Sequence, residues 1–175
     1  MAPTIKTIGS FRTHQKHLID FFGDDLIVTV TPTATVIRRW IRSVRSYNRD
    51  CYRLPEVLRT FLADPKTTFV GVWNGQDQRK LATCRHQLKI GKLLDIRLYV
   101  IDSRGITMRF CSFEQIVKER LGREGVRLDP AICMSDWGVY NLSHDQVLQA
   151  SIESCVCFKL AVEERLWELK SIKGI

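Results

Sequence analysis

The sequence predicts an α/β domain, because short apolar strands alternate along the chain with amphipathic helices. Three observations support this class. Residues 25–31 are rich in β-branched side chains, residues 67–73 form a nearly continuous apolar run, and apolar residues recur at helical spacing from residue 36 onward. The chain has 175 residues, 45% of them hydrophobic and 26% charged, and it shows neither a repeat nor a linker. We therefore expect a single domain over residues 1–175.

The first half of the chain is predicted to contain a strand, two helices and a second strand. Residues 25–31 form the first strand, bounded by acids and a proline. A helix begins at Thr33 or Thr35, with apolar residues on one face and arginines on the other. Residues 54–62 form a second amphipathic helix with proline in its first turn. The run at 67–73 is typical of a strand that is buried on both faces.

The second half of the chain begins with a turn at Asn74-Gly75. We expect a helix over 77–88, a strand over 93–101, and a helix over 112–121 that opens on Ser-x-x-Gln. A loop-rich stretch separates this helix from the last one, which opens on Ser143 with a second Ser-x-x-Gln and runs from about His144 to Leu169. Only three clear strands result, which is few for a sheet covered by this many helices.

Composition excludes several classes of protein. The longest uncharged run spans twelve residues, 26–37, whereas a membrane span needs roughly 18 or more apolar residues. The first ten residues lack the cationic start and apolar core of a secretory signal. We therefore expect a soluble protein without a membrane partner, located in the cytoplasm, with the nucleus as a second compartment. The six cysteines contain no C-x-x-C pair, which favours reduced thiols over a zinc site.

Positive charge is concentrated in one segment. Lys plus Arg is 27 and Asp plus Glu is 19, which gives a net charge of +8. Residues 36–59 contain seven arginines and two acids. A clustered basic face attracts polyanions, of which phosphate backbones are the usual ones, although a solvated helix face explains the same pattern. The arginines are Arg38, Arg39, Arg42, Arg45, Arg49, Arg53 and Arg59.

Two acids stand out by their context. Asp77 follows a buried strand and a tight turn, and ligands of open α/β sheets bind beyond the carboxyl ends of strands. The alternative is a first-turn acid that stabilises the helix dipole. Glu153 is the only charged residue in the apolar helical stretch 147–158, where a carboxylate costs free energy unless a metal or an arginine pairs with it. The alternative is a position at the rim with its carboxylate in water.

Three segments resemble the Werner-type exonucleases of the DEDD superfamily. They are LPEVLRTFLADP (54–65), FVGVWNGQDQRKL (69–81) and NLSHDQVLQASIESCVCFKL (141–160). Within this superfamily the chain is similar to small plant proteins that include the RISC-interacting clearing exoribonucleases, and the resemblance covers nearly the whole chain. It implies a ribonuclease-H-like, DnaQ-like exonuclease fold with an incomplete central sheet.

The resemblance also implies an activity, namely 3′-5′ hydrolysis of single-stranded RNA with two divalent metal ions, Mg²⁺ or Mn²⁺. Asp77 matches the second-motif Asp of the family, and Glu153 stands where the last-motif Asp is expected. Both are thus expected to be catalytic and metal-binding residues. Gln149 stands in place of an activating Tyr and cannot accept a proton. The residues expected to contact nucleic acid are Arg38, Arg42, Arg45 and Asn74.

The sequence departs from the family between Asp50 and Cys51. In the family a segment of a few tens of residues follows the arginine-rich helix, and its first strand bears an Asp-x-Glu pair. This chain has no such pair, which indicates a deletion at this junction. Three hypotheses follow: an exoribonuclease that completes its site across a homo-oligomer interface, an inactive relative that binds RNA or a protein, and a chain that folds poorly. Proteins of an RNA-silencing complex are the protein partners that the resemblance suggests.

The two acids are expected to face one cleft. If Asp77 and Glu153 share a metal ion, their carboxylates must lie close together, because Mg²⁺ ligands sit at ~2.1 Å from the ion. A separation of more than about 10 Å would exclude a shared metal site.

The arginine-rich helix generates a testable prediction. If Arg38, Arg42 and Arg45 contact phosphates, RNA binding weakens steeply with salt, with a log–log slope of about −0.7 per contact. Replacing all three with Ala is expected to flatten that slope by about two units. Titration of a labelled single-stranded RNA over a series of salt concentrations measures it, and an unchanged slope would assign the helix to a solvated face.

Overall fold

The structure is a computed structural model and describes residues 2–44 and 54–169. The strands are β1 (Thr4–Phe11), β2 (His14–Phe21), β3 (Asp24–Val30), β4 (Phe69–Gly71) and β5 (Leu93–Asp95). The helices are α1 (Ala34–Val44), α2 (Leu54–Ala63), α3 (Gly75–Thr83), α4 (Phe113–Leu121), α5 (Pro130–Cys133) and α6 (His144–Glu163), with 3₁₀ turns η1 (Ile96–Leu98) and η2 (Leu166–Glu168). The predicted deletion between Asp50 and Cys51 lies outside the described residues.

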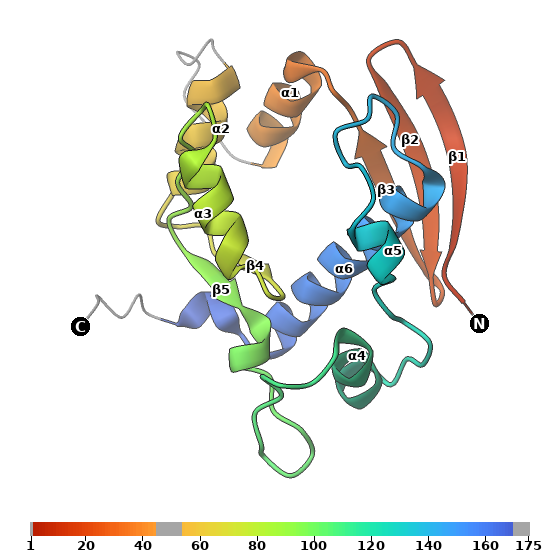
Figure 1. Cartoon of the computed structure of the whole chain (residues 1–175), viewed down its shortest axis with the longest axis vertical. Coiled ribbons are helices and arrows are strands. Elements are labelled where there is room, and N and C mark those ends of the chain that lie inside the picture. Colours follow the sequence, from red (N-terminus) through yellow and green to blue (C-terminus); the bar gives the residue numbers. More distant parts are fainter. Residues whose placement is uncertain (1, 45–53, 170–175) are drawn as a thin grey trace.

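The strands form two separate sheets in the described part of the chain. Strands β1, β2 and β3 make an antiparallel sheet in that order, and β4 and β5 make a parallel pair. Figure 1 shows the antiparallel sheet on one side, α1, α2 and α3 on the other, and α6 crossing below both. The predicted mixed α/β class is confirmed, and the parallel sheet is small.

Strands β1 and β2 were not expected from the sequence. Most side chains of β1 are exposed, so its apolar residues do not form the alternating pattern of a half-buried strand. The strand expected over 93–101 is also shorter, because it ends at Asp95 and continues as the 3₁₀ turn η1.

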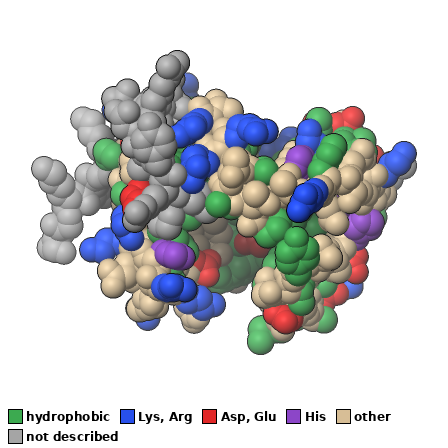
Figure 2. Space-filling model, turned by 90° about the horizontal axis from the view of Figure 1, so that it is seen from above, with side chains coloured by type: hydrophobic (Ala, Val, Ile, Leu, Met, Phe, Trp, Pro, Cys, Tyr) green, Lys and Arg blue, Asp and Glu red, His purple; other side chains and the backbone are tan. Residues whose placement is uncertain are grey.

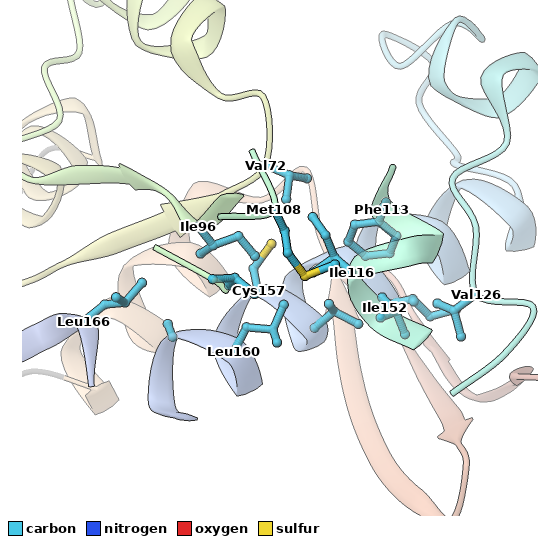
Figure 3. Close-up of a cluster of buried hydrophobic side chains, with 14 of the residues drawn as sticks. Val72, Ile96, Met108, Phe113, Ile116, Val126, Ile152, Cys157, Leu160 and Leu166 are labelled. Carbon is cyan, nitrogen blue, oxygen red and sulfur yellow. The ribbon is translucent and has the colours of Figure 1, made fainter. Parts of the chain in front are cut away.

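The hydrophobic core lies along one face of α6. Ile152, Val156 and Leu160 of this helix are buried, and they pack with Ile116 of α4 and Ile96 of η1 (Figure 3). Removing such a side chain from water stabilises the fold by roughly 1.5–3 kcal/mol each. Helix α6 therefore connects elements that lie far apart in the sequence.

The starts of the last two long helices are predicted correctly. Ser112 and Ser143 each form a capping box with the Gln three residues later. Helix α6 ends at Glu163, earlier than the expected Leu169, and Arg165 beyond it has a φ of +51°. The helix expected over 77–88 likewise ends early, at Thr83. None of the described helices combines the length and apolar character that a membrane span needs.

The predicted apolar face of α1 is only partly buried. Ile41 is fully buried, but Trp40 is 54% exposed and Val44 is 51% exposed. Trp40 packs edge-to-face on Phe61 of α2 at 5.8 Å, and Phe61 packs on Phe69 of β4 at 5.4 Å. The predicted helix and its apolar face are thus present, but that face is not buried along its whole length.

Two histidines share one hydroxyl where the antiparallel sheet meets α6. The Thr7 hydroxyl of β1 lies 3.2 Å from His17 Nδ1 and 2.9 Å from His144 Nε2. His17 is 1% exposed, and its Nε2 is buried without a hydrogen-bond partner among the described residues. Burial, followed by the charge of His144, lowers the pKa of His17. The contact therefore favours a neutral His17.

We expect this contact to make stability pH-dependent. The folded chain keeps His17 neutral, whereas the unfolded chain binds a proton below the ordinary pKa of 6.5. The free energy of unfolding should therefore fall as the pH drops from about 7.5 to about 5.5. Urea unfolding at both pH values measures this, and His17→Gln should reduce the difference. His86→Gln changes an exposed histidine and should leave it unaltered; an equal pH dependence in wild type and His17→Gln would contradict the expectation.

Candidate functional site

The carboxyl ends of the two parallel strands meet at one edge. Gly71 of β4 pairs with Asp95 of β5. Beyond β4, the Asn74 side chain donates from Nδ2 to the Leu94 carbonyl at 2.9 Å, and the Asn74 carbonyl accepts the Asp77 N–H at 3.1 Å. These bonds tie the turn to β5 and place Asp77 in the first turn of α3, at the end of the sheet.

The turn between β4 and α3 is tight and strained. Trp73 has a φ of +50°, a conformation that costs a bulky residue on the order of 1–3 kcal/mol. A Cβ at Gly71 would lie 3.0 Å from Asn74 Nδ2, so glycine lets the Asn74 side chain pack against the strand. The Arg97 guanidinium stacks 4.8 Å over the Trp73 ring and pairs with Asp95 at 2.6 Å. Such strain is typical of functional sites.

Glu153 reaches the same site from α6. The side chain is half-buried, and α6 packs against β4. Burial raises the pKa of Glu153, and the negative charge of Asp77 raises it further. The structure therefore brings the two predicted carboxylates within electrostatic reach of each other, while their roles stay predictions.

Asp95 and Cys157 extend this cluster. Burial raises the pKa of Cys157 to about 12, with added contributions from the charges of Glu153 and Asp95. At neutral pH its thiol is thus protonated, and a protonated thiol is not a metal ligand. Asp95 accepts hydrogen bonds from Arg97 Nε at 3.0 Å and from its terminal nitrogen at 2.6 Å, so an internal cation already neutralises it.

Sequence reasoning did not select Asp95 as a site residue. The available signal was its position as the first charge after a short apolar strand, which mirrors the position of Asp77 after β4. Only the parallel pairing shows that the two strand ends coincide.

The residues present fit one cation better than two. Two carboxylates are sufficient protein ligands for one hydrated Mg²⁺ or Mn²⁺. A pair of metals 3.5–4 Å apart needs more ligands. No group of three or more acidic, His or Cys side chains suited to a metal occurs within residues 2–44 and 54–169. The four-carboxylate arrangement implied by the resemblance does not fit this part of the chain.

Gln149 has a structural role. It is buried, and its Oε1 accepts the Asp129 N–H at 2.8 Å while Nε2 donates to Cys133 Sγ at 3.1 Å. Asp129 in turn caps α5. Gln149 therefore holds α5 against α6 and offers no proton acceptor at the carboxylates.

The predicted nucleic-acid contacts differ in their surroundings. Arg38 is half-buried and its Nε has no hydrogen-bond partner among the described residues, whereas Arg42, one helical turn later, is exposed. Arg45 lies outside the described residues. Asn74 is 8% exposed and uses its amide to hold the turn. Its contact with nucleic acid, like those of the arginines, stays a prediction.

Comparisons with known proteins give weak likenesses. No family model matches the chain, and no curated protein matches it. The solved structures similar to it include the EXD2 exonuclease domain soaked in Mn, with 20% identity over 94% of this chain and 76% of that chain and a TM-score of 0.30. The same domain soaked in Mn and GMP gives 19% identity, coverages of 98% and 83%, and a TM-score of 0.30. The ribonuclease-H-like arrangement and the plant subtype therefore stay predictions.

The position of Glu153 predicts that its removal stabilises the fold. Its folded pKa is raised above the ordinary 4.5, so the folded state binds more protons than the unfolded state and stability falls as the pH rises through this range. Glu153→Gln removes the buried charge and its repulsion by Asp77. We expect a higher free energy of unfolding than wild type at about pH 7 and a smaller difference at about pH 4.5.

Glu124→Gln is the matched control. Lys118 pairs with Glu124 at 2.9 Å and lowers the pKa of this exposed carboxyl, so the substitution should be neutral or slightly destabilising at neutral pH. Urea unfolding of the three proteins gives the comparison. A Glu153→Gln protein less stable than wild type at neutral pH would show that this carboxylate has a stabilising partner.

Proposed function

We propose that this chain is a 3′-5′ exonuclease-type domain that acts on single-stranded RNA, with Asp77 and Glu153 holding a divalent cation, Mg²⁺ or Mn²⁺. The observation that supports the proposal is that Asp77 begins α3 just beyond the strand pair and that Glu153, on the helix that packs on β4, feels the charge of Asp77. Ligands of α/β sheets bind at this end.

Charge at the site supports a cation. Burial, followed by the negative charge of Asp77, raises the pKa of Glu153, and neither carboxylate forms an ion pair with another described residue. Glu153 is half-buried and Asp77 is exposed, and a partly buried negative charge beside a second one is costly unless a positive charge neutralises it. A divalent cation held there would stabilise negative charge on a phosphate group of the substrate. The proposal uses one such ion, because the described ligands do not suffice for a pair.

RNA is proposed as the substrate from charge and from the sequence resemblance. The chain carries a net charge of +8, and α1 presents Arg39 and Arg42 on its exposed surface. A second copy of this chain is a proposed partner, since it could contribute further acids to the site. Proteins of an RNA-silencing complex are proposed as partners on the resemblance alone.

A second function is an RNA-binding domain that does not hydrolyse its ligand. One observation favours it: Gln149, at the place of the family's activating residue, is committed to Asp129 and Cys133. Gln149 therefore supplies no general base that would help an attacking water to lose its proton.

A cleavage assay separates the two functions. We expect slow, metal-dependent shortening of single-stranded RNA that has a free 3′ end, and none when that end is blocked. Asp77→Asn and Glu153→Gln should each reduce the rate at least ~10-fold, the smallest loss expected even for an outer-shell partner of a metal ligand.

Glu163→Gln, on the same helix but paired with Arg120 at 2.7 Å, is the matched control and should keep the wild-type rate. No metal-dependent shortening by wild type, with RNA binding retained, would favour the binding domain. Equal rates in wild type and both site variants would remove Asp77 and Glu153 from the site.

A further inference from the structure

A broad groove lies between the antiparallel sheet, α1 and α6. It has a volume of about 1190 Å³ and is bounded by β3, by the end of the β1–β2 hairpin, by one side of α1 and by α6. The Thr31 and Thr33 hydroxyls both donate to the Thr13 carbonyl, at 2.7 and 3.0 Å, and so hold the hairpin end to the start of α1. Figure 2 shows the molecule hollowed between its two halves. The groove exceeds the ~300–1,000 Å³ of ordinary small-molecule pockets.

The charged side chains that line the described part of the groove are positive. Among the described residues, its lining contains Lys16, Arg39 and His14 and no acidic residue. Lys16 and Arg39 belong to opposite walls, on β2 and α1. An anionic occupant matches this distribution.

Exposed rings accompany these cations. Trp40 on α1 is 54% exposed, and Phe158 on α6 is 64% exposed. At the hairpin end, His14 stacks on Phe11 with centroids 4.5 Å apart and an interplanar angle of 17°. Cations combined with aromatic faces are the means by which proteins bind single-stranded nucleic acid, because every base has a face that stacks.

The groove is distinct from the carboxylate site. Phe158 lines it, whereas Glu153 does not. At 3.6 residues per turn, Glu153 points about 140° away from Phe158 around α6. Arg39 and Trp40 face the groove, while Arg38 and Arg42, the arginines selected from the sequence, do not line it. Ala150, which also lines the groove, lies only about 60° from Glu153 around α6, so the two sites use adjacent sides of this helix.

We propose that this groove binds a single-stranded polynucleotide, with bases stacking on Trp40 and Phe158 and phosphates contacting Lys16 and Arg39. The inference rests on the proposed function and adds a binding surface apart from the carboxylates. An apolar protein segment would use the rings but would bring no negative charge to Lys16 and Arg39, so the charge of the groove favours the polynucleotide.

Fluorescence anisotropy with EDTA present tests binding without hydrolysis. The probes are labelled oligo(U), oligo(dT) and a duplex of about 12 nucleotides, a length within the ~4–16 nucleotides that one single-strand-binding module covers. Trp40→Ala and Phe158→Ala are each expected to weaken binding about fivefold or more, the lower end of the stacking contribution. The matched controls are Trp167→Ala and Phe110→Ala, which remove exposed rings outside the groove.

A substitution that adds a negative charge at an exposed position tests the groove with little risk that the variant fails to fold. Thr29 is exposed on β3 and lines the groove, so Thr29→Glu adds a negative charge without removing a buried contact. It should weaken binding, whereas Thr4→Glu on β1 should not. Lys16→Gln with Arg39→Gln should flatten the salt slope by about 1.4, at about 0.7 for each lost contact with a single strand.

Weaker binding of both single strands in the groove variants supports the proposal, and a preference for oligo(U) over oligo(dT) identifies RNA as the ligand. Equal affinity of wild type and groove variants overturns it, as does wild-type binding to the duplex alone. Absence of oligonucleotide binding, with a dimer that Thr29→Glu dissociates, also overturns it and assigns the groove to a second copy. EDTA abolishes metal-dependent cleavage, so the anisotropy assay reports binding alone. If the groove binds single strands in this assay but the cleavage assay shows no hydrolysis, only the proposed function is overturned.

Discussion

The buried face of α6 is the constraint on which the rest of the structure depends. Each of the two sheets is small, and a two-stranded parallel pair cannot build a core by itself. The apolar side chains of α6 provide the surface on which α4 and η1 pack. At its two ends the helix also reaches the antiparallel sheet, where His144 contacts Thr7 and Lys159 pairs with Asp24 at 2.6 Å. Helix α6 thus sets the position of one sheet relative to the other.

Three sides of α6 face three different environments. One side is core, a second carries Glu153 toward the strand ends, and a third forms part of the groove. A carboxylate that is half-buried beside another carboxylate opposes stability, as does the positive φ of Trp73. Local conflicts of this kind are found mostly where a protein binds or reacts, because elsewhere a better-packed side chain would serve.

Features that depend on neighbouring residues were predictable from the sequence, and features that depend on distant packing were not. The capping boxes at Ser112 and Ser143 are local, and both are present. Glu153 could be selected because its helical stretch is otherwise apolar. The exposure of Trp40 could not be predicted, since it depends on what covers α1. The Asp95–Arg97 pair was also inaccessible, because a strand pattern over 93–101 gives no sign that the chain turns at Asp95.

The position of α6 along the chain has a consequence for synthesis. The antiparallel sheet is made first and consists of sequential hairpins, whose contacts are short in sequence and quick to form. Its buried side chains, such as Phe21, belong to the core around α6 and gain their cover only after residues 144–163 have left the ribosome. At ~5–20 residues per second, more than a hundred residues separate these two events. During those seconds the nascent chain exposes an apolar sheet face, the kind of transient surface that favours aggregation until it is covered.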